Sequence, residues 1–137
     1  RSSINICLNS LSEKPSVEAH VYATRVNLGI IYNNGRKPNL ALEQFDIAIK
    51  YESIKAETLL NQGNSLYLLK DFTGALSKYD EALENNIRDI SSVYFNKGLV
   101  FEKMGNTQDA IVFYKKAVSI NPDLMMRFDE RIRLDKS

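Results

Sequence analysis

The chain has 137 residues, of which 44% are hydrophobic and 26% are charged, and its formal net charge is +1. This composition falls in the ordinary globular range and excludes an intrinsically disordered chain. So small a net charge supplies no positive field for a nucleic-acid backbone or an anionic lipid surface. The single cysteine, Cys7, excludes an intramolecular disulfide and a thiolate metal cage.

No apolar run approaches the roughly 18 residues of a membrane-spanning helix. We therefore expect no nucleic-acid partner, no membrane insertion and a cytoplasmic location. Because the chain begins with Arg1 rather than methionine, we also expect a fragment or a processed product of a longer protein, from which any targeting segment has been removed.

Residues 1–21 are predicted to form an N-terminal helical segment. Its apolar residues share one helical face, and the helix is expected to break at Lys14-Pro15, with a new long helix starting near Pro15. The segment fits the second helix of an upstream repeat that the sequence truncates. The apolar residues are Ile4, Cys7, Leu8 and Leu11.

Three helical hairpins are predicted over residues 22–55, 56–90 and 91–124, because small and aromatic residues recur there in fixed phase. In each hairpin a glycine is followed after twelve residues by an alanine, after four more by an aromatic residue, and after three more by another alanine. The apolar spacing is helical rather than alternating, so the fold class is all-α. The residues are Gly29, Gly63, Gly98; Ala41, Ala75, Ala110; Phe45, Tyr79, Tyr114; Ala48, Ala82 and Ala117.

Turn residues predict where the helices of each hairpin end. The first hairpin should turn at Asn34-Gly35 and resume at Pro38, and the second should turn at Lys70-Asp71. In the third, Asn106 is expected to cap the second helix, which stops before Asn121-Pro122. Residues 125–137 are predicted to form a capping helix with Met125, Phe128 and Ile132 on one face.

The segment from Tyr94 to Phe101, followed by Gly105, Ala110, Tyr114, Ala117 and Pro122, resembles a tetratricopeptide repeat. The first two hairpins match less fully: Arg25 stands in place of the usual opening aromatic, and Ser53 and Ile87 stand in place of proline. The resemblance covers about three quarters of the chain. It implies a right-handed helical solenoid that acts as a protein-interaction module or scaffold. Within each hairpin we expect the glycine to face the alanine of the partner helix.

In this family the first helices of the hairpins line a concave groove, which implies that an extended or helical peptide segment of a partner protein binds there and indicates the residues that bind it. Two before each glycine stand Asn27, Asn61 and Asn96, whose carboxamides suit a peptide backbone; the alternative is that they face solvent. The flanking positions are expected to select side chains, unless they are buried against the adjacent helix. They are Val26, Leu60 and Phe95; Ile30, Asn64 and Leu99; and Asn33, Tyr67 and Glu102.

Other functions have weaker support in the sequence. Val26 and Ile30 occupy positions where a clamp for the acidic tail of chaperones needs lysine and asparagine, so that function is disfavoured. The single histidine, His20, provides no metal or general-base site, and we expect no enzyme activity and no cofactor. The alternatives are a scaffold that self-associates through its repeat ends, and a non-catalytic targeting region of a larger protein.

Overall fold

The computed structural model describes the backbone of residues 2–127 and the side chains of residues 17–127. Within these residues every regular element is helical, which confirms the all-α prediction. The helices are α1 (Ser2–Asn34), α2 (Pro38–Ala48), α3 (Lys55–Leu68), α4 (Phe72–Glu84), α5 (Ile90–Lys103) and α6 (Thr107–Ile120), with short 3-10 turns at Glu52–Ile54 and Pro122–Leu124.

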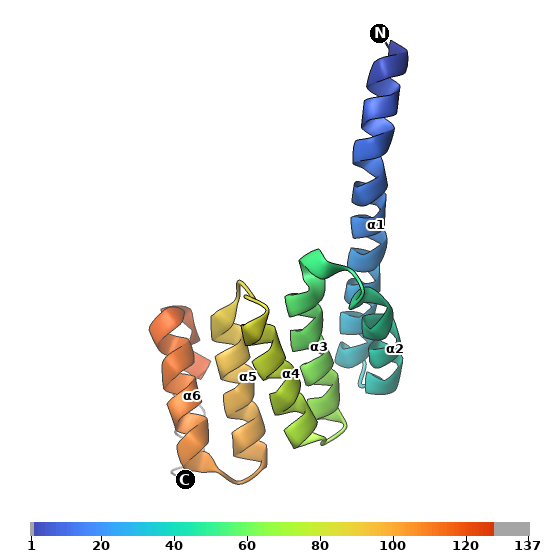
Figure 1. Ribbon diagram of the computed structural model, residues 1–137. Coiled ribbons are helices and arrows are strands. Elements are labelled where there is room, and N and C mark those ends of the chain that lie inside the picture. Colours follow the sequence, from blue (N-terminus) through green and yellow to red (C-terminus); the bar gives the residue numbers. More distant parts are fainter. Residues whose placement is uncertain (1, 128–137) are drawn as a thin grey trace.

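The helices pair in sequence as three hairpins, α1–α2, α3–α4 and α5–α6, which stand side by side (Figure 1). Contacts of α2 with α3 and of α4 with α5 join successive hairpins, and α1, α3 and α5 also contact one another in order. The result is a right-handed helical solenoid, in which each hairpin packs on its neighbours rather than around one central core.

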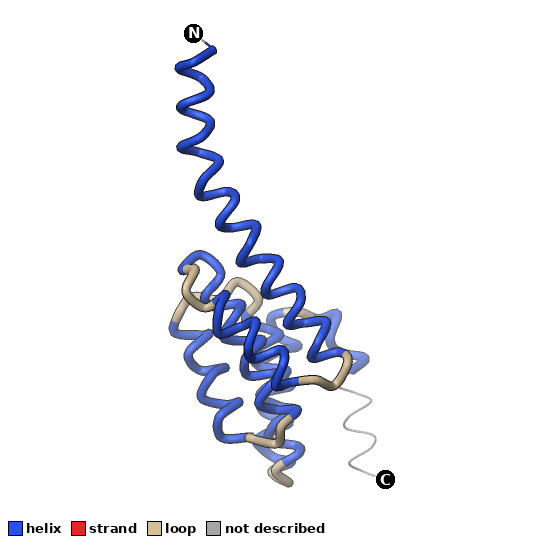
Figure 2. Tube along the Cα trace, turned by 90° about the vertical axis from the view of Figure 1, so that its right-hand side faces the viewer, coloured by secondary structure: helices blue, strands red, loops and turns tan. Residues whose placement is uncertain are grey.

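The N-terminal segment differs from its prediction, because α1 is one helix of 33 residues that passes through Lys14-Pro15 without a break. A proline inside a helix removes one backbone hydrogen bond and crowds the carbonyl four residues earlier, which bends a helix without necessarily ending it. Figure 2 shows α1 bending along its length, with its N-terminal part projecting beyond the hairpins. At the other end, Met125–Arg127 are helical, whereas the rest of the predicted capping helix, with Phe128 and Ile132, lies outside the described residues.

The turns within the three hairpins share one geometry. Arg36, Lys70 and Gly105, each seven residues after the pattern glycine, adopt positive φ of 62°, 66° and 83°. The next residue donates its N–H to a carbonyl five residues earlier, as in Lys37 N to Tyr32 O at 2.8 Å. This bonding closes the first helix of a hairpin and sends the chain back antiparallel.

The interior contact of each hairpin corrects the expected pairing of glycine with alanine. A Cβ atom on Gly63 or Gly98 would lie 2.5 Å from Cε1 of Tyr79 or Tyr114, and one on Gly29 would meet the ring of Phe45 in the same way. The glycine therefore makes room for an aromatic ring of the partner helix. The alanines of the repeat are completely buried.

Candidate functional site

The main cavity of the described residues has a volume of about 400 Å³ and crosses α1, α3 and α5. We call it the groove. Of the twelve positions that the sequence assigns to the groove, seven line it: Ile30, Asn33, Asn61, Asn64, Tyr67, Asn96 and Leu99. Its other lining residues, Asn34, Arg36, Leu68 and Tyr79, are not among the predicted positions.

Five predicted residues do not line the groove: Val26, Asn27, Leu60, Phe95 and Glu102. Phe95 is a clear correction: its side chain is 2% exposed, and its ring lies 5.0 Å from that of Tyr114 in the core. Leu60 is half-buried and packs against the core that α3, α4 and α5 share.

The groove runs obliquely across the repeats, which explains the absence of Asn27. On α1 its lining begins one residue after the glycine and extends to Arg36 in the turn. On α5 the lining consists of the residues two before and one after the glycine, Asn96 and Leu99. From the first hairpin to the third, the lining residues thus shift toward the N-terminal end of the first helix. Asn27 is exposed and lies outside the groove.

A pair of asparagines at the groove centre is held in a fixed orientation. The Asn64 Oδ1 atom accepts a hydrogen bond from the Tyr79 hydroxyl at 2.6 Å and another from Asn96 Nδ2 at 3.0 Å. Two donors occupy this oxygen, so the Asn64 amide nitrogen is turned away from them. Within the described residues, no partner takes up the Asn64 Nδ2 donor or the Asn96 Oδ1 acceptor.

Tyr79 is suited to keep that orientation. Its side chain is 1% exposed, and burial raises the pKa of its phenol well above the ordinary value. The hydroxyl therefore stays protonated and continues to donate to Asn64 at all physiological pH values. A ring that fills the hairpin interior thus also orients a side chain on the groove surface.

Two further asparagines are used mainly for structure. Asn33, which is 9% exposed, accepts from the Ser65 hydroxyl at 2.8 Å and donates to the Asn61 carbonyl at 3.4 Å, so it links α1 to α3. Asn61 Nδ2 donates to the Glu57 carbonyl one turn earlier in its own helix at 2.9 Å. Its Oδ1 atom has no partner among the described residues and remains an acceptor beside the groove.

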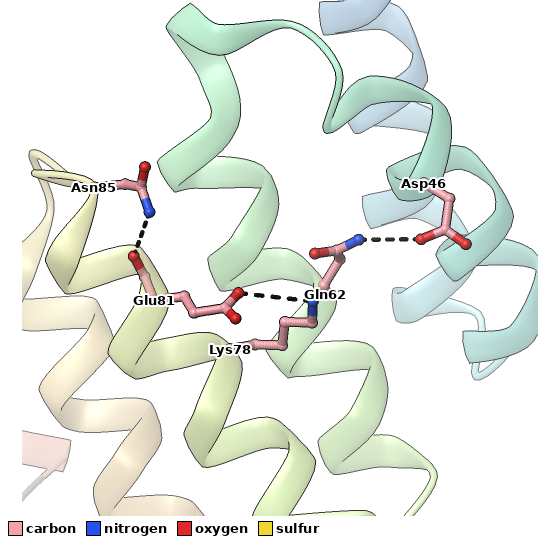
Figure 3. Close-up of polar contacts among 5 residues, drawn as sticks. All are labelled: Asp46, Gln62, Lys78, Glu81 and Asn85. Atoms are coloured by element: carbon pink, nitrogen blue, oxygen red, sulfur yellow. Dashed lines mark hydrogen bonds and ion pairs between the residues drawn. The ribbon is translucent and has the colours of Figure 1, made fainter.

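Figure 3 shows a separate set of polar contacts, one between α2 and α3 and two along α4. Gln62 is 4% exposed and donates from Nε2 to Asp46 Oδ1 at 3.1 Å, whereas its buried Oε1 has no partner within the described residues. Lys78 and Glu81 form a 3.8 Å ion pair on α4. The Gln62–Asp46 hydrogen bond connects the first two hairpins, whereas the ion pair stays within α4.

The paired helices and their regular stacking define a class of protein: a helical-repeat solenoid. Two family models described as tetratricopeptide repeat match adjacent stretches, residues 27–90 and residues 91–124, and together they span well over half of the chain. The chain belongs to the tetratricopeptide repeat family.

Similar proteins agree with this assignment. Over 95 residues the chain is 28% identical to the Type IV pilus assembly protein PilF of Pseudomonas aeruginosa, covering 69% of this chain but only 38% of PilF. The solved PilF structure matches with a TM-score of 0.65 and 23% identity, covering 96% of this chain and 69% of that one. The Arabidopsis OM64 TPR domain matches with a TM-score of 0.71 and 18% identity, over 85% and 97% of the two chains.

Repeat modules of this family generally bind proteins and are generally non-catalytic, so a protein-interaction module is the function class of this chain. Over residues 2–127, the helices lack any stretch with the length and hydropathy of a membrane-spanning segment.

Proposed function

We propose that the chain binds an extended peptide segment of a partner protein in the groove. The observation that carries this proposal is the Asn64–Asn96 pair, which presents one amide donor and one carbonyl acceptor side by side. A peptide backbone offers the complementary acceptor and donor at every residue, so the pair can bind it whatever its side chains are. Asn61 also lines the groove, and its Oδ1 atom adds a second acceptor.

Side-chain selection comes from the apolar residues of the groove. Ile30, Tyr67 and Leu99 are half-buried and surround the amide pair, one on each of the three first helices. An extended peptide turns alternate side chains toward the surface that binds it, so these residues favour apolar side chains in the ligand. The name of the related PilF, an assembly protein, is in keeping with a module that joins proteins.

The experiment begins with a random-peptide library selected on the wild-type chain, followed by fluorescence anisotropy with the selected peptides. Replacing Asn61 and Asn96 together by alanine should weaken binding about tenfold, because two net hydrogen bonds are lost. The helical circular dichroism should stay unchanged, since the Asn61 side chain bonds only within its own helix, the Asn61 carbonyl that accepts from Asn33 is kept, and the hydroxyl of Tyr79 keeps Asn64 as its acceptor.

Asn27→Ala is the matched control, because Asn27 occupies the same repeat position but lies outside the groove. It should leave the affinity unchanged. If no peptide is selected, or if the double variant binds as tightly as the wild type, the proposed function is wrong. Light scattering over a range of concentrations tests the competing scaffold function, which requires concentration-dependent self-association.

A further inference from the structure

A second cavity lies at the tips of the hairpins. It measures about 300 Å³ and is lined by Arg36, Tyr67, Leu68, Lys70, Phe72 and Lys103. We call it the tip pocket. It shares Arg36, Tyr67 and Leu68 with the groove, so the two cavities adjoin. In Figure 1 the turns that close the three hairpins follow one another along the lower edge of the solenoid.

The charge of the tip pocket is uniform. Each hairpin contributes one cation, Arg36 from the first, Lys70 from the second and Lys103 from the third, and no carboxylate lines the cavity. Within the described residues, none of the three forms an ion pair. Two acids are adjacent to these cations in sequence, and both have other partners: Asp71 caps α4 by accepting from Gly74 N at 3.1 Å, and Glu102 accepts from the Tyr114 hydroxyl.

Two of these cations occupy backbone positions where other residues would be more stable. Arg36 and Lys70 have positive φ, a conformation that costs residues other than glycine free energy, whereas the third hairpin has Gly105 at this position. Residues kept in such positions often serve a function. Here they place cations beside an apolar surface made by Leu68 and by the rings of Tyr67 and Phe72, whose centroids are 6.1 Å apart.

We propose that the tip pocket binds an acidic residue of the peptide, together with an apolar side chain next to it. The inference rests on the proposed function, because the peptide enters the pocket from the groove. The carboxylate pairs with Arg36, Lys70 and Lys103, and the apolar side chain packs on Tyr67, Leu68 and Phe72. The groove thus holds the backbone of the peptide, and the tip pocket fixes its direction and selects its sequence.

The test uses the peptides selected on the wild-type chain, which should be enriched in aspartate or glutamate next to an apolar residue. Replacing Arg36, Lys70 and Lys103 together by glutamine should weaken their binding about five- to tenfold at low salt, and less at high salt where charges are screened. Replacing the acid of the peptide by its amide should cause the same loss in the wild type and no further loss in the variant.

The matched control replaces the exposed Lys50, Arg88 and Lys115 by glutamine, which gives the same net charge but leaves the tip pocket intact. This control should keep wild-type affinity. Equal binding by the two triple variants, or selected peptides without an acid, would overturn the inference while leaving the groove intact. Dependence on the tip cations without dependence on Asn61 and Asn96 would support the inference and contradict the groove. Displacement of the peptides by single-stranded DNA or inorganic phosphate at lower concentration than by free acidic peptide would also overturn it.

Discussion

The first and third hairpins pack their interiors in the same way and share one turn geometry, but they have different residues at the turn. In both, a glycine of the first helix receives an aromatic ring of the second, Phe45 on Gly29 and Tyr114 on Gly98. At the turn, the first hairpin has Arg36 and an uncapped α2, whereas the third has Gly105 and Asn106, whose side chain accepts from Asp109 N at 3.2 Å. The glycine and the aromatic ring thus recur because the two helices need them to pack closely, whereas the residues at the turn differ from one hairpin to another.

The largest expected change in stability comes from substitutions at the buried glycines, which test whether the first and third hairpins pack their interiors in the same way. Gly29→Ala and Gly98→Ala each add a methyl group that overlaps an aromatic ring of the partner helix. Each should therefore lower the free energy of unfolding by about 1–3 kcal/mol. Urea denaturation measures both values. A clear loss for one variant and none for the other would show that the two interiors are not built alike.

Substitutions at the turns of the first and third hairpins should change the free energy of unfolding in opposite directions. Gly105 has open space around its α-carbon, so Gly105→Ala should cost about 1 kcal/mol through its positive φ alone. Arg36→Gly relieves that strain in the first hairpin and should raise stability by up to about 1 kcal/mol, while weakening the binding of acidic peptides. If Arg36→Gly destabilised the chain as much as Gly105→Ala, the strain assigned to Arg36 would be absent.

The smallest effect concerns the helix caps of the third hairpin. Asp89 caps α5 by accepting from Ser92 N at 3.2 Å, and its hydrogen bonds, first of all with the Ser92 side chain, hold the pKa of its carboxyl below the ordinary value. A lowered pKa in the folded state stabilises the fold above the unfolded pKa of about 4 and loses this contribution as the pH falls toward the folded pKa.

The difference in unfolding free energy between wild type and Asp89→Ala should therefore be constant near neutral pH and shrink below about pH 4. Urea titrations at a series of pH values measure it. A difference that does not depend on pH would mean that the carboxylate charge contributes nothing to the cap.

The repeat residues were sufficient to predict the hairpins, because packing of the helix pair dictates them and they follow one another at fixed spacing. The turn at Lys70-Asp71, the start of α2 at Pro38 and the cap at Asn106 were all located from local chemistry. Pro15 misled the prediction because a helix can continue through a proline when its other hydrogen bonds remain.

The groove was harder to predict from sequence, because its course depends on how each hairpin is offset from the next. A position counted from the glycine has the same direction on every first helix, yet Asn61 and Asn96 line the groove and Asn27 does not. The tip pocket had one unused signal in the sequence: Arg36 and Lys70 stand where the third hairpin has Gly105, seven residues after the pattern glycine.

The central claim is that Tyr79 orients Asn64 and Asn96 to hold a peptide backbone. The most direct test is a ¹H–¹⁵N NMR titration that follows the side-chain amide signals of these two asparagines. Adding a selected peptide should shift both signals to saturation and leave that of Asn27 in place. Saturating binding with no change at Asn64 and Asn96 would contradict the account.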